Sequence, residues 1–228
     1  MLQRILLVAV IAGALAGLAA TVVQAARLWP LIAVAERYEE GAAAHQHGDA
    51  TAAHEHDHEW QPAEGAQRIA FTTLFNVLAG FGFALLLNGA LALRQAVLRG
   101  AAPDMATGVL WGLAGFACFA LAPSFGLPPE LPGMEAADLV GRQLWWASAA
   151  LASAVGLALL AFAKPVPWKA LGVVVLVAPH VIGAPHTQET GSVPGELAAQ
   201  FVAASLLAAA VFWVVLGAVS GWLHRRLA

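Results

Sequence analysis

The segment of this chain best suited to chemistry is a run of histidines and carboxylates between residues 45 and 59. Five of the eight histidines fall within fourteen residues of an otherwise apolar sequence. Neutral imidazole binds Co²⁺, Ni²⁺, Zn²⁺ and Cu²⁺, and protons compete for it below its free pKa of about 6.5. We therefore favour metal collection over the alternative, a solvated linker with incidental histidines. The predicted ligands are His45, His47, His54, His56, Asp57 and His58.

A second constellation, residues 179–186, reads Pro-His-Val-Ile-Gly-Ala-Pro-His. Proline removes a backbone donor, so we expect a helix to bend or unwind at Pro179. Ionisable groups at membrane depth are costly and often functional. His180 is therefore a candidate metal ligand inside the membrane, and His186 is a candidate nearer the mouth of a path. The alternative for both is an interfacial histidine bonded to a carbonyl.

The amino-acid composition predicts that these residues belong to a membrane protein. Hydrophobic residues make up 60% of the 228 and charged residues only 11%, whereas soluble domains carry about 25% charged residues. The chain has one cysteine, which excludes an intramolecular disulfide and a thiolate cluster. No P-loop, basic patch or aromatic platform suggests ATP hydrolysis or nucleic-acid binding. We predict an integral membrane protein that is not an enzyme.

Six apolar segments could cross a membrane. Each must be a helix, because unpaired backbone groups in lipid cost several kcal/mol. The fold class is thus an all-α bundle of about six transmembrane helices, forming one membrane domain over residues 1–228 with a His-rich outer loop at 27–68. A five-span bundle with a re-entrant fifth segment is the alternative. The segments are about residues 5–26, 69–93, 105–122, 144–163, 168–182 and 197–222.

Glycines four residues apart predict close packing of several of these helices. Gly13 and Gly17 have this spacing in the first segment, which favours a retained span over a cleaved signal peptide. The same spacing recurs at residues 108 and 112 and at residues 217 and 221.

Charge placement predicts the orientation. With six spans, one side carries seven basic residues and one acid, Asp104, while the other carries four arginines and thirteen acids. The positive-inside rule then places both termini in the cytoplasm and the histidine loop outside.

Smaller features carry further expectations. Residues 31–44 predict a short interfacial helix, and the four prolines of residues 122–134 predict a rigid, non-helical loop. Asn76 and Asn88 are expected to form hydrogen bonds between helices. Arg142 is expected to pair with an acid of the outer rim, formed by Glu130, Glu135 and Asp138. His224 is interpreted as part of the cytoplasmic tail.

Several motifs together resemble one known family. They are HEHDHEW at 54–60, LWGLAGF at 110–116, LPPELPGM at 127–134, RQLWW at 142–146 and PHVIGAPH at 179–186. Over essentially the whole chain, this pattern resembles the CbtA family of proposed cobalt transporter subunits. The resemblance implies Co²⁺ uptake, a link to cobalamin biosynthesis and a CbtB-like partner, a small one-span His-bearing subunit.

These inferences predict a bacterial inner-membrane subunit for Co²⁺ uptake, with Ni²⁺ or Zn²⁺ as alternative substrates. The outer loop would capture the ion and pass it to a path near His180. Lipid and the CbtB-like subunit are the expected partners, a homo-oligomer remains open, and nucleic acid is excluded. Two rival classes are a metal-sensing adaptor and a metal-dependent membrane enzyme with His180 and His186 as ligands.

Overall fold

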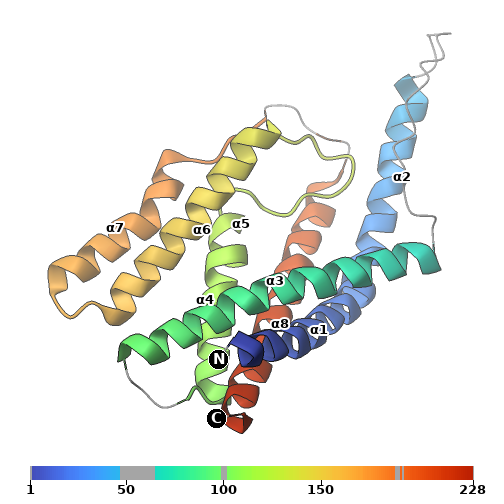
Figure 1. The fold of residues 1–228 in the computed structure, drawn as a ribbon. Helices are drawn as coiled ribbons and strands as arrows, with labels where there is room; N and C mark the ends of the chain where they lie inside the picture. Colours follow the sequence, from blue (N-terminus) through green and yellow to red (C-terminus); the bar gives the residue numbers. More distant parts are fainter. Residues whose placement is uncertain (1, 47–64, 99–101, 188–190, 192, 228) are drawn as a thin grey trace.

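The computed structural model describes residues 2–46, 65–98, 102–187, 191 and 193–227. These residues form helices joined by loops, with no strand among them (Figure 1), so the predicted all-α class is confirmed. The elements are α1 (Leu2–Arg27), α2 (Trp29–Gln46), α3 (Ala66–Leu98), α4 (Met105–Phe116), the π-helix η2 (Ala117–Leu121), α5 (Ala122–Ser124), α6 (Leu139–Phe162), α7 (Val166–Ile182) and α8 (Gly195–Arg226).

Five helices are long and apolar enough to cross a membrane. They are α1, α3, α6, α8 and the helix Met105–Ser124, which α4, η2 and α5 form together. The apolar helix α7 has only 17 residues. Each of the six predicted segments therefore corresponds to a helix, and the fifth segment, which the five-span alternative treats as re-entrant, is the shortest.

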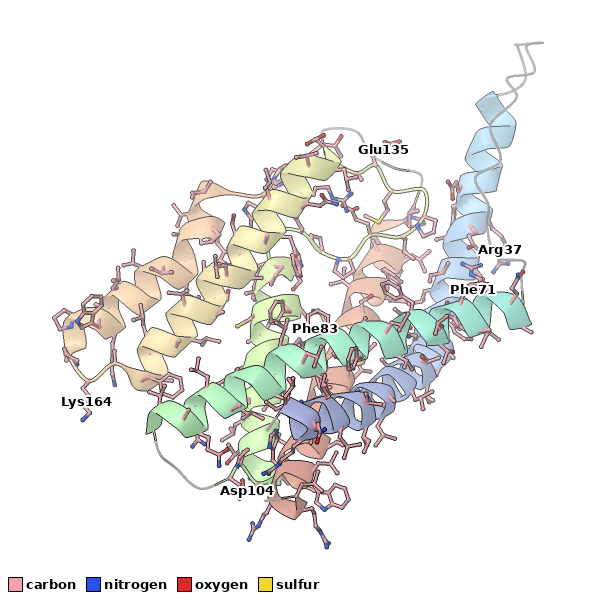
Figure 2. The ribbon with its side chains drawn as sticks, viewed as in Figure 1. Arg37, Phe71, Phe83, Asp104, Glu135 and Lys164 are labelled. Carbon is pink, nitrogen blue, oxygen red and sulfur yellow. The ribbon has the colours of Figure 1, made fainter. Side chains whose placement is uncertain are left out.

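The helices run between two ends of the bundle (Figure 1). Both termini lie at one end, the termini end, where Arg4 of α1 donates a hydrogen bond to the backbone carbonyl of His224 in α8. The opposite end holds residues 125–138, here called the proline loop. Lys164 and Asp104 lie on the termini side of Figure 2, and Glu135 and Arg37 on the other. These two pairs of residues thus lie at opposite ends of the bundle.

Glycines bring three helix pairs into near backbone contact. In the α4–α8 pair, a Cβ built on Gly108 would overlap the carbonyl of Gly217, and one on Gly112 would overlap that of Trp213. Gly13 and Gly17 of α1 face the α3 backbone in the same way, and Gly156 of α6 faces Gly172 of α7. The predicted glycine packing is confirmed, since side chains at these positions would force the helices apart.

Aromatic rings fill the centre between α3, the Met105–Ser124 helix and α8. Phe119 stacks on Trp213 with ring centroids 5.6 Å apart, and Phe83 meets both rings edge-on at 5.3 and 5.1 Å. Phe119 belongs to η2, and π-helical turns of this kind often occur at functional sites. Position 123 is proline and cannot donate to the turn before it.

The α6–α7 pair is attached along one face. Among the described helices α7 packs only on α6, while α6 also contacts α4, η2 and α5. Aromatic pairs mark that contact, Trp111 with Phe162 and Phe119 with Trp146, each with centroids 6.2 Å apart. The pair is therefore a peripheral part of the bundle (Figure 1).

Candidate functional site

The predicted metal-collecting segment begins at the far end of α2. Ala35 of α2 is fully buried in a cluster with α8 and the proline loop, and Glu36 forms an ion pair of 2.8 Å with Arg68 of α3. Beyond this contact α2 runs on by ten residues, or about 15 Å, away from the bundle (Figure 1). The predicted helix at residues 31–44 is confirmed. His45 lies in the last turn of α2, while His47, His54, His56, Asp57 and His58 lie outside the described residues.

His180 lies in the last turn of the peripheral helix α7. Its imidazole meets the rings of Trp145 and Phe125 edge-on, with centroids 5.7 and 6.3 Å away. The Nε1 atom of Trp145 donates a hydrogen bond of 3.2 Å to the carbonyl of Pro179. The rings of Trp145, near the start of α6, and Phe125, in the proline loop, therefore position His180.

The helix was expected to bend or unwind at Pro179, and it does not unwind there. The helix continues to Ile182 and ends at Gly183, whose φ of 90° suits glycine and whose N–H donates to the Pro179 carbonyl at 3.0 Å. The missing N–H of Pro179 removes the i→i−4 hydrogen bond to the carbonyl of Val175, and the helix nevertheless continues for three more residues.

The two histidines of this segment are not part of a preformed ligand cluster. His186 is exposed and lies in the coil after α7. Among the described residues, no three His, Cys, Asp or Glu side chains are close enough to hold one ion. Any metal site that uses His180 would therefore need further ligands from elsewhere, such as backbone oxygens or residues beyond the described ranges.

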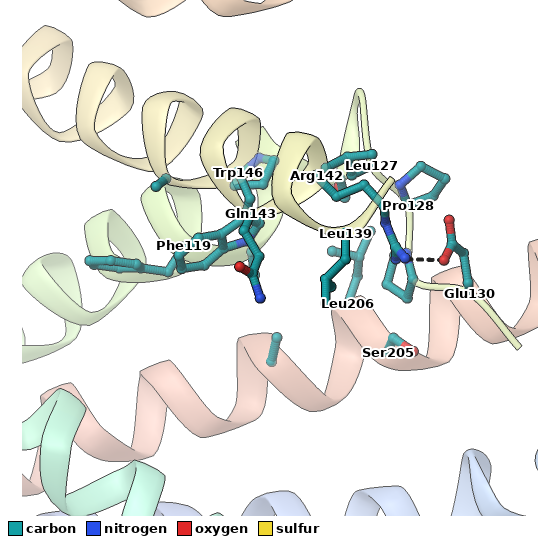
Figure 3. A pocket seen from close by; sticks show the side chains of 16 residues that line it. Phe119, Leu127, Pro128, Glu130, Leu139, Arg142, Gln143, Trp146, Ser205 and Leu206 are labelled. Atoms are coloured by element: carbon teal, nitrogen blue, oxygen red, sulfur yellow. Dashed lines mark hydrogen bonds and ion pairs between the residues drawn. The ribbon is translucent and has the colours of Figure 1, made fainter. Parts of the chain in front are cut away.

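A cleft of about 690 Å³ lies on another side of α6. It lies between α6, the Phe119–Ser124 turn, the proline loop and α8 (Figure 3). Apolar side chains such as Leu139, Trp146 and Leu206 form most of its wall. His180 does not line it, because that residue packs against the opposite side of α6.

An ion pair stands at the proline-loop end of this cleft. An Nη atom of Arg142 lies 2.6 Å from Oε2 of Glu130, and each side chain is about one-quarter exposed. The expected pairing of Arg142 with the acidic rim is thus confirmed. Gln143 lies further into the cleft and points from α6 towards α8, whereas Ser205 of α8 lies nearer the Arg142–Glu130 pair (Figure 3).

A buried polar network at the termini end was missed by the sequence reading. Nδ2 of Asn88 donates to the Ala84 carbonyl at 2.7 Å and to Ser220 Oγ at 3.2 Å. Its Oδ1 lies 2.8 Å from Nε2 of His224. Asn88 and Ser220 are fully buried and His224 is 4% exposed. His224, which was interpreted as part of the cytoplasmic tail, is thus buried within α8. The bonding between helices expected of Asn88 is confirmed.

The second predicted asparagine lies nearer the other end. Nδ2 of Asn76 on α3 donates to Thr21 Oγ1 at 2.9 Å and to Gln24 Oε1 at 2.7 Å, both on α1. Its predicted bond between helices is confirmed. The two asparagines thus join α3 to different neighbours rather than lining one path.

Asp104 fixes the start of the helix that carries η2. Its Oδ1 accepts a hydrogen bond of 2.9 Å from the backbone N–H of Thr107, as an N-cap does. This bond lowers the pKa of the Asp104 carboxyl, and Arg225 adds a smaller effect in the same direction. The site is at the termini end, outside the apolar part of the helix.

Comparison with known proteins identifies a family. A family model described as "Probable cobalt transporter subunit (CbtA)" matches residues 2–225. No curated protein and no solved structure matches the chain significantly.

Proposed function

Because the chain belongs to the CbtA family of probable cobalt transporter subunits, we propose that it is the membrane subunit through which Co²⁺ enters the bacterial cytoplasm. The observation that carries this proposal is the match over residues 2–225, nearly the whole chain. The apolar helices of the bundle support a multi-pass membrane location. Transport is not an enzymatic activity, so the family supports the expectation that the chain is not an enzyme.

We place the protein in the inner membrane with six crossings and both termini inside. The separation of charges between the two ends supports this orientation through the positive-inside rule. The direction of the helices supports the count. Since α6 ends and α7 begins at the termini side, and α8 begins beside the proline loop, α7 must return the chain across the bundle (Figure 1).

In this proposal the outer loop collects the ion. Its ligands are His45, His47, His54, His56, Asp57 and His58, held away from the bundle by α2. The support is chemical, because imidazole and carboxylate together suit divalent first-row metals. The ion then passes to a path near His180 and His186, beside the proline loop.

Co²⁺ is the proposed substrate because of the family description, not because of ligand type. Nitrogen ligands bind Ni²⁺ and Cu²⁺ more tightly than Co²⁺. Ni²⁺ and Zn²⁺ are therefore the competitors against which specificity must be measured.

The word "subunit" in the family description supports a protein partner. We propose that this partner is a CbtB-like chain with a single membrane span and its own histidines. The partner would complete the transporter.

Radioactive Co²⁺ uptake tests the proposal. Cells that lack other cobalt importers would express this chain, the CbtB-like chain, both or neither, with expression checked by tags. We expect uptake well above empty cells when both are present, and little competition from a tenfold excess of Zn²⁺. Uptake equal to that of empty cells in every combination would contradict transport and favour the metal-sensing class.

A further inference from the structure

A titratable side chain is buried where three helices meet at the termini end. His224 of α8 is 4% exposed, and Asn88 of α3 and Ser220 of α8 beside it are fully buried. Arg4 of α1 donates a hydrogen bond to the backbone carbonyl of His224. These four residues are here called the termini joint. None of them belongs to the metal path proposed above.

The hydrogen bonds of the termini joint require the imidazole to carry a proton on Nε2. Nδ2 of Asn88 donates to the Ala84 carbonyl at 2.7 Å and to Ser220 Oγ at 3.2 Å. Its Oδ1 is therefore left to accept the bond of 2.8 Å from Nε2 of His224. A neutral imidazole supplies this one donor. A second proton would have to bind Nδ1, and it would turn the buried ring into a cation.

The surroundings of the ring are unfavourable to that cation. Among the described residues, the charged side chains at this end of the elements packed on α8 and of α8 itself are four positive and one negative: Arg4 on α1, Arg94 on α3, Asp104 before α4, and Arg225 and Arg226 on α8. The one acid, Asp104, caps α4 and lies 3.9 Å from Arg225. No carboxylate within the described ranges forms an ion pair with His224. A charge buried without an anionic partner is strongly disfavoured.

We propose that the termini joint is an acid-sensitive contact, which holds α1 and α3 against α8 while the His224 imidazole is neutral and opens when it takes up a proton. In an unfolded chain an imidazole takes up this proton near pH 6.5, as a free imidazole does (about 6.5). The packed joint resists the proton, so its stabilising contribution is complete above that pH and is lost as the pH falls below it. In the proposed orientation the joint faces the cytoplasm, and its acid response does not depend on cobalt transport.

Thermal unfolding of the full chain in detergent tests the proposal between pH 7.5 and pH 5.5 (about one unit either side of the free imidazole value). His224→Gln keeps a side-chain N–H donor for Asn88 but cannot titrate. We expect the melting temperature of the wild type to fall by about 3 °C more than that of His224→Gln over this range. His186→Gln removes an exposed histidine and is the matched control, which should follow the wild type. Equal falls in the wild type and in His224→Gln would overturn the proposal.

A second variant tests the same joint if His224→Gln does not fold. Asn88→Asp places a carboxylate at the atom that Nε2 of His224 now contacts. A carboxylate stabilises the protonated ring, so the melting temperature of this variant should hold or rise as the pH falls from 7.5 to 5.5. The same acid loss in Asn88→Asp as in the wild type would contradict the role of His224.

Hydrogen exchange shows where the protein opens. Exchange rates, corrected for their intrinsic pH dependence, would be compared at the two pH values for residues 84–92 of α3, residues 216–226 of α8 and the α6–α7 pair. We expect the first two segments to lose protection by about tenfold at the lower pH in the wild type but not in His224→Gln, because the opening is local. The α6–α7 pair should keep its protection. A loss spread equally over all three would rule out a local joint.

Discussion

The Nε2 atom of His224 lies 2.8 Å from Oδ1 of Asn88, a residue 136 positions earlier in the chain. Because Asn88 Nδ2 donates to the Ala84 carbonyl, Oδ1 must be the acceptor and His224 must carry its proton on Nε2. This bond joins α8 to α3 at a fully buried position.

Replacement of either partner should destabilise the fold. Hydrogen bonds between membrane helices contribute about 0.6 kcal/mol on average and up to about 1.7, so Asn88→Leu and His224→Leu should each lower the free energy of unfolding by roughly 1 kcal/mol. The double variant should lose less than the sum, because one bond is shared. Unfolding in mixed detergent would measure the three values, with Gln200→Leu as an exposed control. Strictly additive losses would show that the bond contributes nothing.

Gly108 should not tolerate even a methyl group. A Cβ there would overlap the carbonyl of Gly217, so Gly108→Ala should cost about 1–3 kcal/mol through overpacking. Gly82→Ala in α3 is the matched control, because nothing lies within 4 Å of its Cβ position. That control should be neutral or stabilising by up to about 1 kcal/mol, since alanine favours helix. Thermal unfolding in detergent would compare them, and equal melting temperatures would contradict the packing.

The cap at Asp104 should make stability depend on pH in the acid range. Its pKa is lowered in the folded protein from an ordinary value of 3.8. The ionised cap therefore stabilises the fold above that value, and its contribution is lost as the pH falls through the lower folded pKa. Asp104→Asn keeps a capping oxygen without a titrating charge, so the melting temperature should fall less between pH 5 and pH 3 (about one unit either side of the ordinary value) than in the wild type. If the melting temperatures of the two proteins fall equally over this pH range, Asp104 does not contribute to the loss of stability in acid.

Two substitutions separate the roles of His180. His180→Phe keeps a ring against Trp145 and Phe125 but removes the metal ligand, whereas His180→Ala removes both. If His180 lies on the metal path, both variants should lower maximal Co²⁺ uptake several-fold, and only the alanine variant should lower the melting temperature. Normal uptake by the phenylalanine variant would leave His180 a packing residue.

Removal of residues 45–58 should affect uptake mainly when metal is scarce. A collecting loop raises the local concentration of the ion without forming the rate-limiting path, so the half-saturating Co²⁺ concentration should rise with little change in maximal rate. A Gly/Ser segment of equal length is the control for chain connection. In the wild type, uptake at limiting Co²⁺ should also weaken below about pH 6.5 as imidazoles bind protons. Loss of the maximal rate would instead place the path in this loop.

The sequence predicted the helices well because their signal is local. Runs of apolar residues define all six segments, and glycine spacing identified the contacting faces, such as Gly108 and Gly112 against Gly217 and Gly221. Burial of Asn88 beside His224 could not be predicted in this way. It depends on which helices meet across more than a hundred residues, and His224 stands beside two arginines that indicate a tail.

The candidate site was harder to predict than the fold. Pro179 was expected to bend or unwind α7, and the helix does not unwind there but continues to Ile182. The cleft also escaped prediction, because its wall combines the proline loop with α6 and α8. The described part of the structure does not test the ligand roles proposed for the histidine loop, since those roles depend on residues 47–58.

The shortness of α7 has a consequence for the surrounding lipid. Its 17 residues span about 25 Å, whereas the hydrocarbon core of a typical bilayer is about 30 Å thick. Among the described helices only α6 covers it, and Val173, Val174, Val177 and Val181 are exposed on it. Acyl chains beside α7 must therefore shorten or tilt, at a fraction of a kcal/mol per Å of mismatch. The peripheral α6–α7 pair makes this protein sensitive to bilayer thickness on one flank, and shorter acyl chains should favour the arrangement described.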